Sequence, residues 1–436
     1  MTNQSQRFTT ASGQRTRLDL IYFSIYIREL SSQKPIQPSN GRPISPIQSK
    51  NMPIDFQLSA SEDAIRKHAA AFAAGPLKDI KKHLFRKEGR TTISGIGAFS
   101  PHLGGTGGSL VEGTIVVEEM YATDPSAALT IFGTGLGLTP LNLAGKEQHK
   151  EFLEPFLSGK GAPLAKKGAP GLITTATREG DEWVLNGEKM WATNCAGWDF
   201  EGADLQCVVC RDPKLSRADI ERNQKGAFKT LKHIPSVGHP ACSGPHIKYT
   251  NLRVPTKNVL APPGEGLSVV LGSFDCSAVL VGAMSVSVMR AAFDAALAFA
   301  KKDNRRGAED LLSRQAFADL LSGIKMKAEA SRALTWRAAY ALEHGPGDYD
   351  ARRELALAAK IYCSEESVKA VTDAINAVGV TAYSSEQPFV DLLNTAIVLP
   401  IFDGGNVGVR RRNMQQLMAS KSYDPWASTF GPSQSS

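Results

Sequence analysis

The sequence lacks the cysteine patterns of a metal site or a disulfide framework. It has only six cysteines in 436 residues, and the one close pair, Cys207 and Cys210, stands in the strand-like run CVVC. Successive side chains of a strand alternate between its two faces, so this odd spacing sends the thiols to opposite sides. Zinc and redox chemistry are disfavoured there, and we expect buried free thiols in a reducing compartment.

Long apolar runs are also missing. A membrane-spanning helix needs about 20 predominantly apolar residues, whereas the longest candidates, such as SAVLVGAMSVSVM at 277–289, contain glycine and serine and continue into an amphipathic pattern. We therefore expect a soluble protein with no membrane partner. Its expected location is cytoplasmic, with the mitochondrion as the alternative that a basic N-terminal segment raises.

Neither sign of charge is in strong excess. Lys and Arg number 50 against 43 Asp and Glu, a net charge of +7, and the basic residues are scattered except at 410–412. A nucleic-acid-binding surface needs clustered basic charge, so we expect no nucleic-acid partner. With 42% hydrophobic residues, the chain is long enough for two or three domains with substantial cores.

Acidic residues are nearly absent from the first 52 positions, where Asp19 and Glu29 are the only two. The segment is rich in Ser, Gln, Pro and Arg, a composition that does not support a packed core. We expect 1–52 to be a disordered extension, a wrongly assigned start before Met52, or a targeting segment.

The remaining sequence is helical, then β, then helical again. Apolar residues recur at helical spacing before residue 160, alternate with period two between about 172 and 260, and return to long amphipathic stretches after 265. The fold class is therefore α+β. The predicted domains are an N-terminal α domain (53–164), a small middle β domain (165–263), a C-terminal four-helix bundle (264–429) and a tail (430–436).

Two dipeptides predict tight turns within the β domain. Gly180-Asp181 and Asn186-Gly187 both interrupt runs of β-branched and aromatic residues, and both suit two-residue hairpin turns. We predict a hairpin at each position.

One stretch near the C-terminus, IFDGGNVGVRRRNMQQ at 401–416, places a lone acid between apolar residues and a glycine pair. From the residues alone, Asp403 is best explained as a helix N-cap, whose carboxylate accepts from amides further along. Arg410 stands two helical turns later on the same face, and arginine side chains lean towards the helix N-terminus, so it can reach back to Asp403. Arg411 and Arg412 are expected in a solvated or subunit-facing charge cluster.

Taken together, these motifs resemble the acyl-CoA dehydrogenase superfamily of flavoproteins. The resemblance rests on the order of the three domains and on EWVLNGEKMWATN, YTNLRVPTKNVL, NRRGAEDLLSRQ and IFDGG. Longer stretches, among them SGPHIKYT and LPIFDGGNVGVRRRNMQQLMA, resemble the nitroalkane oxidase family within it. The resemblance runs from residue 53 to residue 429.

This resemblance gives Asp403 a second interpretation. In the family, the residue before this glycine, usually glutamate, is the base that removes a proton next to the activating group, and a partly desolvated carboxylate suits that role. Arg410 would hold the carboxylate, and Ser277 matches a serine that lies beside it. Asp403, Arg410 and Ser277 are the implied catalytic residues.

The same resemblance implies a site for FAD. Trp191 would pack on the isoalloxazine ring and Thr193 would hydrogen-bond near its N5 atom; the plain alternative makes Trp191 a core residue of the β domain. Arg305 and Gln315 resemble the pair that reaches the FAD of a neighbouring subunit, which implies a homotetramer. The other implied cofactor contacts are two glycines, Gly379, for which a helix C-cap is the alternative, and Gly404.

The implied activity is FAD-dependent oxidation of small neutral nitroalkanes by oxygen, giving an aldehyde or ketone, nitrite and hydrogen peroxide after Asp403 removes the α-proton. One alternative is an acyl-CoA dehydrogenase or oxidase acting on a thioester. Aspartate in place of the usual glutamate speaks against it, because the shorter side chain suits the more acidic nitroalkane carbon. The other alternative is a non-catalytic or degraded paralogue that has lost FAD binding.

Three departures from the family pattern support that last alternative. The strand that lines the flavin is expected between Ala165 and Lys166, where the chain runs on directly; a second strand is missing after residue 224; and 76–99 does not resemble the expected helical segment. Lost strands leave unpaired ladder edges. We therefore expect an incomplete β domain, through either a gene-model error or a real loss.

Overall fold

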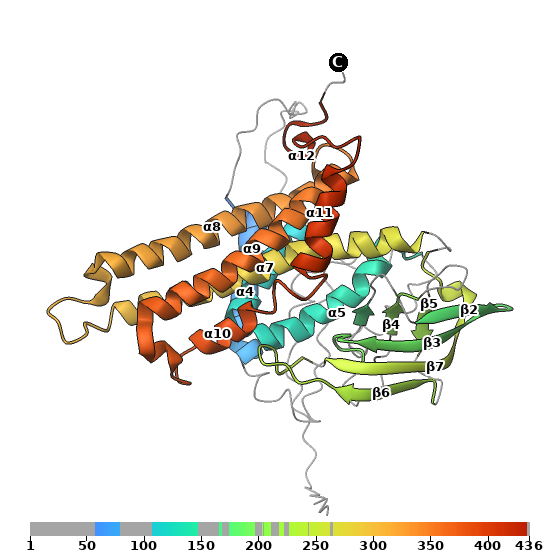
Figure 1. Cartoon of the computed structure of the whole chain (residues 1–436), viewed down its shortest axis with the longest axis horizontal. Helices are drawn as coiled ribbons and strands as arrows, with labels where there is room; N and C mark the ends of the chain where they lie inside the picture. Colours follow the sequence, from blue (N-terminus) through green and yellow to red (C-terminus); the bar gives the residue numbers. More distant parts are fainter. Residues whose placement is uncertain are drawn as a thin grey trace, which may run out of the picture.

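A computed structural model of the chain shows N-terminal helices, two small β-sheets and a helical C-terminal region (Figure 1). The predicted extension at 1–52 and most of the unusual 76–99 segment lie outside the described residues. The structure describes residues 57–78, 107–146, 165–167, 174–196, 203, 205–210, 218–221, 226–242, 244–261 and 265–433.

The N-terminal helices begin where the sequence supplies caps. Ser59 and Ser109 each accept a hydrogen bond from the amide of the glutamate three residues on, and each glutamate accepts from the amide of its serine, which forms a capping box. Asp124 caps the following helix, whose first residue is a proline. The elements are α2 (Ala60–Phe72), which continues into the π-helical turn η1 (Ala73–Leu77), α4 (Leu110–Thr123) and α5 (Pro125–Ala144).

Two small sheets form the middle of the described chain. In the larger sheet the strand order is β2-β3-β7-β6 and all neighbours are antiparallel; in the smaller, β4 lies between β1, which is parallel to it, and β5, which is antiparallel. Alternating side chains of the larger sheet, such as Trp183, Leu185 and Val254, enter its core. The strands are β1 (Ala165–Lys167), β2 (Thr175–Glu179), β3 (Glu182–Met190), β4 (Leu205–Val208), β5 (Ala218–Glu221), β6 (Phe228–His233) and β7 (Pro245–Pro255).

One of the two predicted hairpins is confirmed. Gly180-Asp181 connects β2 to β3. The prediction at Asn186-Gly187 is wrong, because Gly187 lies within β3 at a bulge where the register with β7 shifts, with φ at 139°. A Cβ added there would lie 2.4 Å from Thr174 Cα, so this glycine permits a close approach of two backbones instead of a turn.

A short strand lies at the junction of Ala165 and Lys166, where the sequence departs from the family pattern. Residues 165–167 form β1 and pair in parallel with β4, although no strand was expected there. The absence of the family's flavin-lining segment between Ala165 and Lys166 stays a prediction. Backbone pairing needs no particular side chains, which is why the run Ala-Lys-Lys gave no strand signal. The smaller sheet is nevertheless built from strands of three or four residues, so it is a thin one.

Three long helices, α7 (Gly266–Ala300), α8 (Gln315–His344) and α9 (Tyr349–Val378), pack side by side in the C-terminal region (Figure 1). The fourth helix of the expected bundle is divided: α10 (Phe389–Ala396) packs on α7 and α9, and α11 (Arg411–Met418) packs on α9. The shorter elements are η4 (Thr256–Asn258), η5 (Leu311–Ser313), η6 (Gly379–Tyr383), the π-helical turn η7 (Asn406–Arg410) and α12 (Ala427–Phe430).

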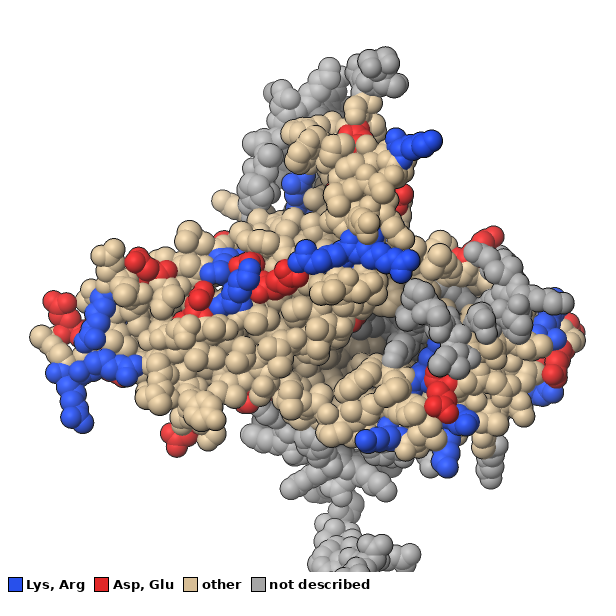
Figure 2. Space-filling view, viewed as in Figure 1, with Lys and Arg blue, Asp and Glu red and all other residues tan. Residues whose placement is uncertain are grey.

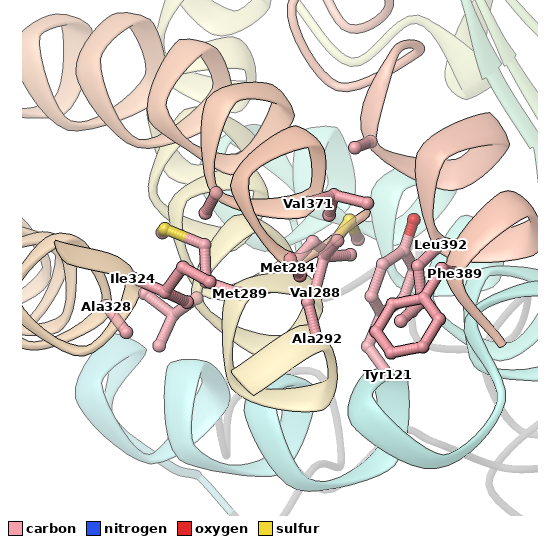
Figure 3. Packing of buried hydrophobic residues seen from close by; sticks show 14 of the residues in the cluster. Tyr121, Met284, Val288, Met289, Ala292, Ile324, Ala328, Val371, Phe389 and Leu392 are labelled. Atoms are coloured by element: carbon pink, nitrogen blue, oxygen red, sulfur yellow. The ribbon is translucent and has the colours of Figure 1, made fainter. Parts of the chain in front are cut away.

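Helix α7 is the centre of the main hydrophobic core. Its Met284 and Val288 cluster with Tyr121 of α4, Val371 of α9 and Phe389 of α10 (Figure 3). By length and composition α7 is the one described helix that could cross a membrane, yet 72% of its most apolar window is buried inside the protein. Because other helices cover it, α7 serves as a core helix that joins the N-terminal and C-terminal helices.

Charges of both signs are interspersed on the face shown in Figure 2. Arg411 is a surface residue, whose side chain is 53% exposed and pairs with Glu365 at 2.7 Å. Arg412 is exposed as well. Exposed pairs of this kind contribute little to stability, so neither arginine belongs to the buried site described next.

Candidate active site

Three side chains from distant parts of the chain meet at the turn between α10 and η7. Ser277 of α7 places its Oγ 2.8 Å from both carboxylate oxygens of Asp403. Arg410, the last residue of η7, places Nη2 3.0 Å from Asp403 Oδ2. The Asp403 side chain is 9% exposed and that of Arg410 is 1% exposed, so the carboxylate is held on two sides in an enclosed place.

The helix-cap interpretation of Asp403 is wrong. The turn η7 begins after Gly405, and no side chain caps it. Asp403 and Gly404 both have positive φ, 52° and 72°, so the chain bends here in a way that helix entry does not require. The carboxylate consequently meets Ser277 of α7 and Arg410 instead of the amides of the next turn.

Arg410 is fixed by backbone carbonyls as well as by Asp403. Its Nη2 donates to the carbonyl of Asp403 (2.8 Å) and to that of Phe274 (2.9 Å), and its Nε donates to the carbonyl of Gly404 (3.2 Å). A planar guanidinium satisfies several acceptors at fixed angles, which an ammonium group does not. The prediction that Arg410 reaches back to Asp403 is confirmed, and Arg410 also ties this turn to α7.

The sequence reasoning missed a second carboxylate behind Arg410. Asp275 of α7 is 1% exposed; its Oδ1 lies 3.7 Å from Arg410 Nη1, and its Oδ2 accepts from Arg353 Nε and Tyr349 Oη at 3.0 Å. Burial raises the pKa of Asp275, while Arg353 and Arg410 oppose that rise. The available signal was an acid in the middle of an apolar helix, since buried acids are usually paired.

A buried lysine, also missed, lies against the same turn. Lys360 of α9 is completely buried, and its Nζ donates to the Leu399 carbonyl and to Asn406 Oδ1, both at 2.8 Å. Burial lowers the pKa of Lys360 to about 7, although the negative charge of Asp403 acts in the opposite direction. One amine therefore contacts residues on both sides of Asp403.

Trp191, which follows β3, is not a core residue, so that alternative is wrong. It is 54% exposed and has φ at 55°. A Cβ added to Gly244 would lie 3.2 Å from the Cε3 atom of Trp191, and a Cβ added to Gly133 would lie 3.0 Å from the methyl group of Thr193. An exposed indole bordered by glycine fits a flat aromatic ring such as that of a flavin.

Arg305, Gly379 and Gln315 form a separate group. Arg305 donates from Nη2 to the carbonyl of Val378. Gly379 is the C-cap of α9, as the alternative predicted, with φ at 77°, and a Cβ there would lie 3.6 Å from the Arg305 guanidinium. Gln315 is the exposed first residue of α8. The structure brings Arg305 and Gly379 together, and their contact with FAD remains a prediction.

The thiols take no part in these groups. Cys207 and Cys210 are both buried, as expected, and none of the six cysteines is in a disulfide. Among the described residues, no group of His, Cys, Asp and Glu could hold a metal ion.

The fold and site define a flavin-dependent oxidoreductase of the acyl-CoA dehydrogenase type. The N-terminal domain of acyl-CoA dehydrogenases matches residues 59–160, and their C-terminal domain matches residues 264–418. The nitroalkane oxidase of Podospora anserina is 57% identical over 427 residues, which cover 87% of this chain and 99% of that relative. The chain belongs to the acyl-CoA dehydrogenase family, in its nitroalkane oxidase branch.

Solved structures agree with this placement. The Podospora anserina nitroalkane oxidase structure matches with a TM-score of 0.83 and 56% identity, covering 87% of this chain and all of that one. Nitroalkane oxidase structures 37% identical to this chain, with a TM-score of 0.81 and the same coverage, include an active-site serine-to-alanine variant with 1-nitrohexane and an active-site aspartate-to-asparagine variant with 1-nitrooctane. A further one concerns the roles of an arginine and an aspartate in the reaction. These residue types are the ones that meet at Ser277, Asp403 and Arg410.

The match also shows that this chain is internally shorter than its relative. The alignment has 427 positions, whereas 87% of the 436 residues is about 379. The Podospora enzyme therefore has residues without a counterpart inside the matched span. The chain is therefore internally shortened, and the location of the shortening in the β domain stays a prediction.

Proposed function

We propose that this chain is an FAD-dependent nitroalkane oxidase that converts small neutral nitroalkanes, oxygen and water to an aldehyde or ketone, nitrite and hydrogen peroxide. The observation that carries the proposal is the buried contact of Asp403 with Ser277 and Arg410. The thioester alternative is disfavoured because the base position holds aspartate, not the glutamate usual in thioester-oxidising members of the family.

Asp403 has the geometry of a general base. Its carboxylate is acceptor-only when ionised, almost closed off from solvent, and held within hydrogen-bond distance of two donors. A base that is already oriented towards the reacting carbon loses little freedom when it takes the proton. Removal of the α-proton converts the neutral nitroalkane to its nitronate anion, which is the form that is then oxidised.

Ser277 and Arg410 orient this base from two sides. Ser277 donates from α7, and Arg410 donates from the following turn while holding three backbone carbonyls. Asp275 keeps a negative charge on the far side of Arg410. The guanidinium therefore cannot swing away from Asp403 without losing several charge-assisted hydrogen bonds.

FAD, when bound, supplies the electron acceptor that oxygen reoxidises. Trp191 and Thr193 would lie against its ring, and Arg305, Gln315 and Gly379 would serve the FAD of a neighbouring subunit in a homotetramer. Two strongly exposed apolar side chains support such an assembly. Val380 and Tyr383, 84% and 82% exposed, lie in the turn η6 that begins at Gly379, and exposed apolar residues of this kind suit a subunit interface.

The test is turnover by the purified chain supplied with FAD. We expect oxygen consumption and nitrite release with nitroethane, and no turnover of butyryl-CoA under the same conditions. Turnover of the thioester alone would favour the dehydrogenase alternative. Absence of flavin absorbance after gel filtration with added FAD would instead favour the non-catalytic paralogue.

A further inference from the structure

We propose that Lys360 is a positioning residue for Asp403. Its amine binds both ends of the turn that carries the Asp403 carboxylate. This inference rests on the proposed function, because it takes Asp403 as the group that removes the proton. Lys360 lies in the middle of α9, which carries none of the catalytic candidates, and it reaches the turn through two hydrogen bonds.

A first set of hydrogen bonds joins the two ends of the turn that contains Asp403. Lys360 Nζ donates to the Leu399 carbonyl before the turn and to the Asn406 side chain after it, both at 2.8 Å. The backbone amide of Asn406 donates to the Pro400 carbonyl at 2.8 Å. Asp403 therefore lies inside a loop whose two ends are bridged once by backbone and once by the lysine amine.

A second set attaches this closed turn to α9. Asn406 Nδ2 donates to Ser364 Oγ at 3.0 Å and to Glu365 Oε1 at 3.1 Å. Lys360 lies one turn of α9 before the adjacent residues Ser364 and Glu365. Lys360 and Asn406 together thus fix the position of the turn along α9, with Asp403 in contact with Ser277 of α7.

The turn needs such support because its backbone is strained at the base. Asp403 and Gly404 have consecutive positive φ values of 52° and 72°, and a left-handed conformation costs most non-glycine residues about 1 to 2 kcal/mol, with a smaller cost for aspartate. Strain of this kind persists only where the surroundings impose it. If the turn relaxed, the carboxylate would leave Ser277, and a displacement of about 1 Å can lower a catalysed rate by roughly 100-fold.

Burying an ammonium group at this position costs free energy of desolvation. Asp403, Glu365 and Arg410 are the charged groups that act on Lys360, and burial still lowers its pKa to about 7. A methionine of similar length would fill the same volume without the cost of desolvation. What only the lysine supplies is a donor that reaches Leu399 and Asn406 at once.

The test compares Lys360→Met with Lys369→Met. Lys369 is on the same helix, but its side chain is 62% exposed and pairs only with Glu366. We expect Lys360→Met to lower kcat for neutral nitroethane by about 10- to 100-fold and to change oxidation of preformed ethyl nitronate less than twofold, with the FAD content unchanged. Lys369→Met should match the wild type with both substrates.

Hydrogen exchange of the peptides that cover 399–410 gives a readout that needs no catalysis. Exchange should be faster in Lys360→Met and in Asn406→Leu than in the wild type, and unchanged in Lys369→Met. Because both residues act in one hydrogen-bonded unit, the double variant should lose no more than the worse single variant.

The outcomes separate the two claims. Unchanged exchange at 399–410, or equal losses with nitroethane and nitronate, would overturn the positioning role of Lys360. If the wild type does not oxidise nitroethane but hydrogen exchange is still faster in Lys360→Met, the proposed function is rejected. The role of Lys360 in the turn then still stands. If Lys360→Met does not fold, Asn406→Leu alone tests the same bridge.

Discussion

The two sides of the site differ in how their residues are held. On the bundle side, Asp403, Arg410 and Ser277 are buried and bound to one another by hydrogen bonds within a single chain. On the β side, Trp191 follows β3 of the larger sheet and leaves more than half of its surface exposed. The chain alone therefore preorganises Asp403 for acid–base chemistry, whereas we propose that FAD and a partner subunit complete the cofactor side.

Asp403→Asn should produce the largest effect and tests the bundle side directly. Without its base, the enzyme should turn over neutral nitroethane about 10²- to 10⁴-fold more slowly. Preformed nitronate has already lost its proton and should be oxidised at nearly the wild-type rate. Nitrite release from both substrates measures the difference, and equal loss with both would mean that Asp403 serves folding or flavin binding instead.

Asp275→Asn tests whether the preorganised side also stabilises the fold. The change leaves Arg353 and Arg410 buried without their shared negative charge, and breaking a buried ion pair costs about 3 to 5 kcal/mol. Urea unfolding measures the loss. Asp350→Asn is the matched control, because Asp350 pairs with the same Arg353 but is 63% exposed; similar stabilities of the two variants would contradict the prediction.

Arg410→Lys should separate orientation from charge. Lysine keeps the positive charge but loses the fork that reaches Asp403, Gly404 and Phe274 together. One lost hydrogen bond to a charged group is worth about 1.5 to 3 kcal/mol, so we expect roughly a 10- to 100-fold lower rate with nitroethane at unchanged FAD content. Arg411→Lys, at the exposed neighbour, should have no effect; a wild-type rate in Arg410→Lys would remove Arg410 from the site.

Exchanging the β1 segment should sharpen the comparison from the cofactor side. Replacing residues 165–174 by the corresponding segment of the Podospora anserina enzyme should tighten FAD binding, since one regained hydrogen bond of about 1 kcal/mol corresponds to roughly fivefold in Kd. Flavin fluorescence measures the Kd. Exchange of the α8–α9 connector, residues 345–348, is the control; equal Kd values for both chimaeras would show that β1 already serves the flavin.

A pH dependence of stability is expected at Lys360. Its folded pKa is lowered to about 7 from 10.5, so above pH 7 the unfolded chain binds more protons than the folded one. Relative to Lys360→Met, the wild type should therefore gain free energy of unfolding as pH rises from 7 to 9, by at most about 1.4 kcal/mol per pH unit. A constant difference across that range would show that burial does not perturb this lysine.

The sequence predicted those parts of the fold whose signals are local. Helical periodicity indicated α7, α8 and α9, and Gly180-Asp181 indicated the β2–β3 hairpin. The run Ala165–Lys167 carries no strand signal, because β1 depends on its pairing with β4. The turn prediction at Asn186-Gly187 was wrong because a glycine suits a β-bulge as well as a turn. Here Gly187 permits the close approach of the Thr174 backbone.

The site divides in the same way. The spacing of Asp403 and Arg410 predicted their contact, since both lie in one short segment. Ser277 could be proposed only from the family resemblance. Lys360 could not be found, and Asp275 gave only the signal of an acid in an apolar helix, because the role of each depends on which other element packs against its helix. Such contacts are set by tertiary structure, and periodicity does not report them.

The left-handed backbone at Asp403 also limits which acid can stand there. Aspartate and asparagine are among the few non-glycine residues that adopt positive φ readily, because their short polar side chains can hydrogen-bond locally; glutamate has no such advantage. Exchange of this aspartate for glutamate would therefore change the main chain as well as the length of the side chain. The loop conformation and the identity of the base are inherited together, so drift towards the thioester-oxidising members would require two coordinated changes.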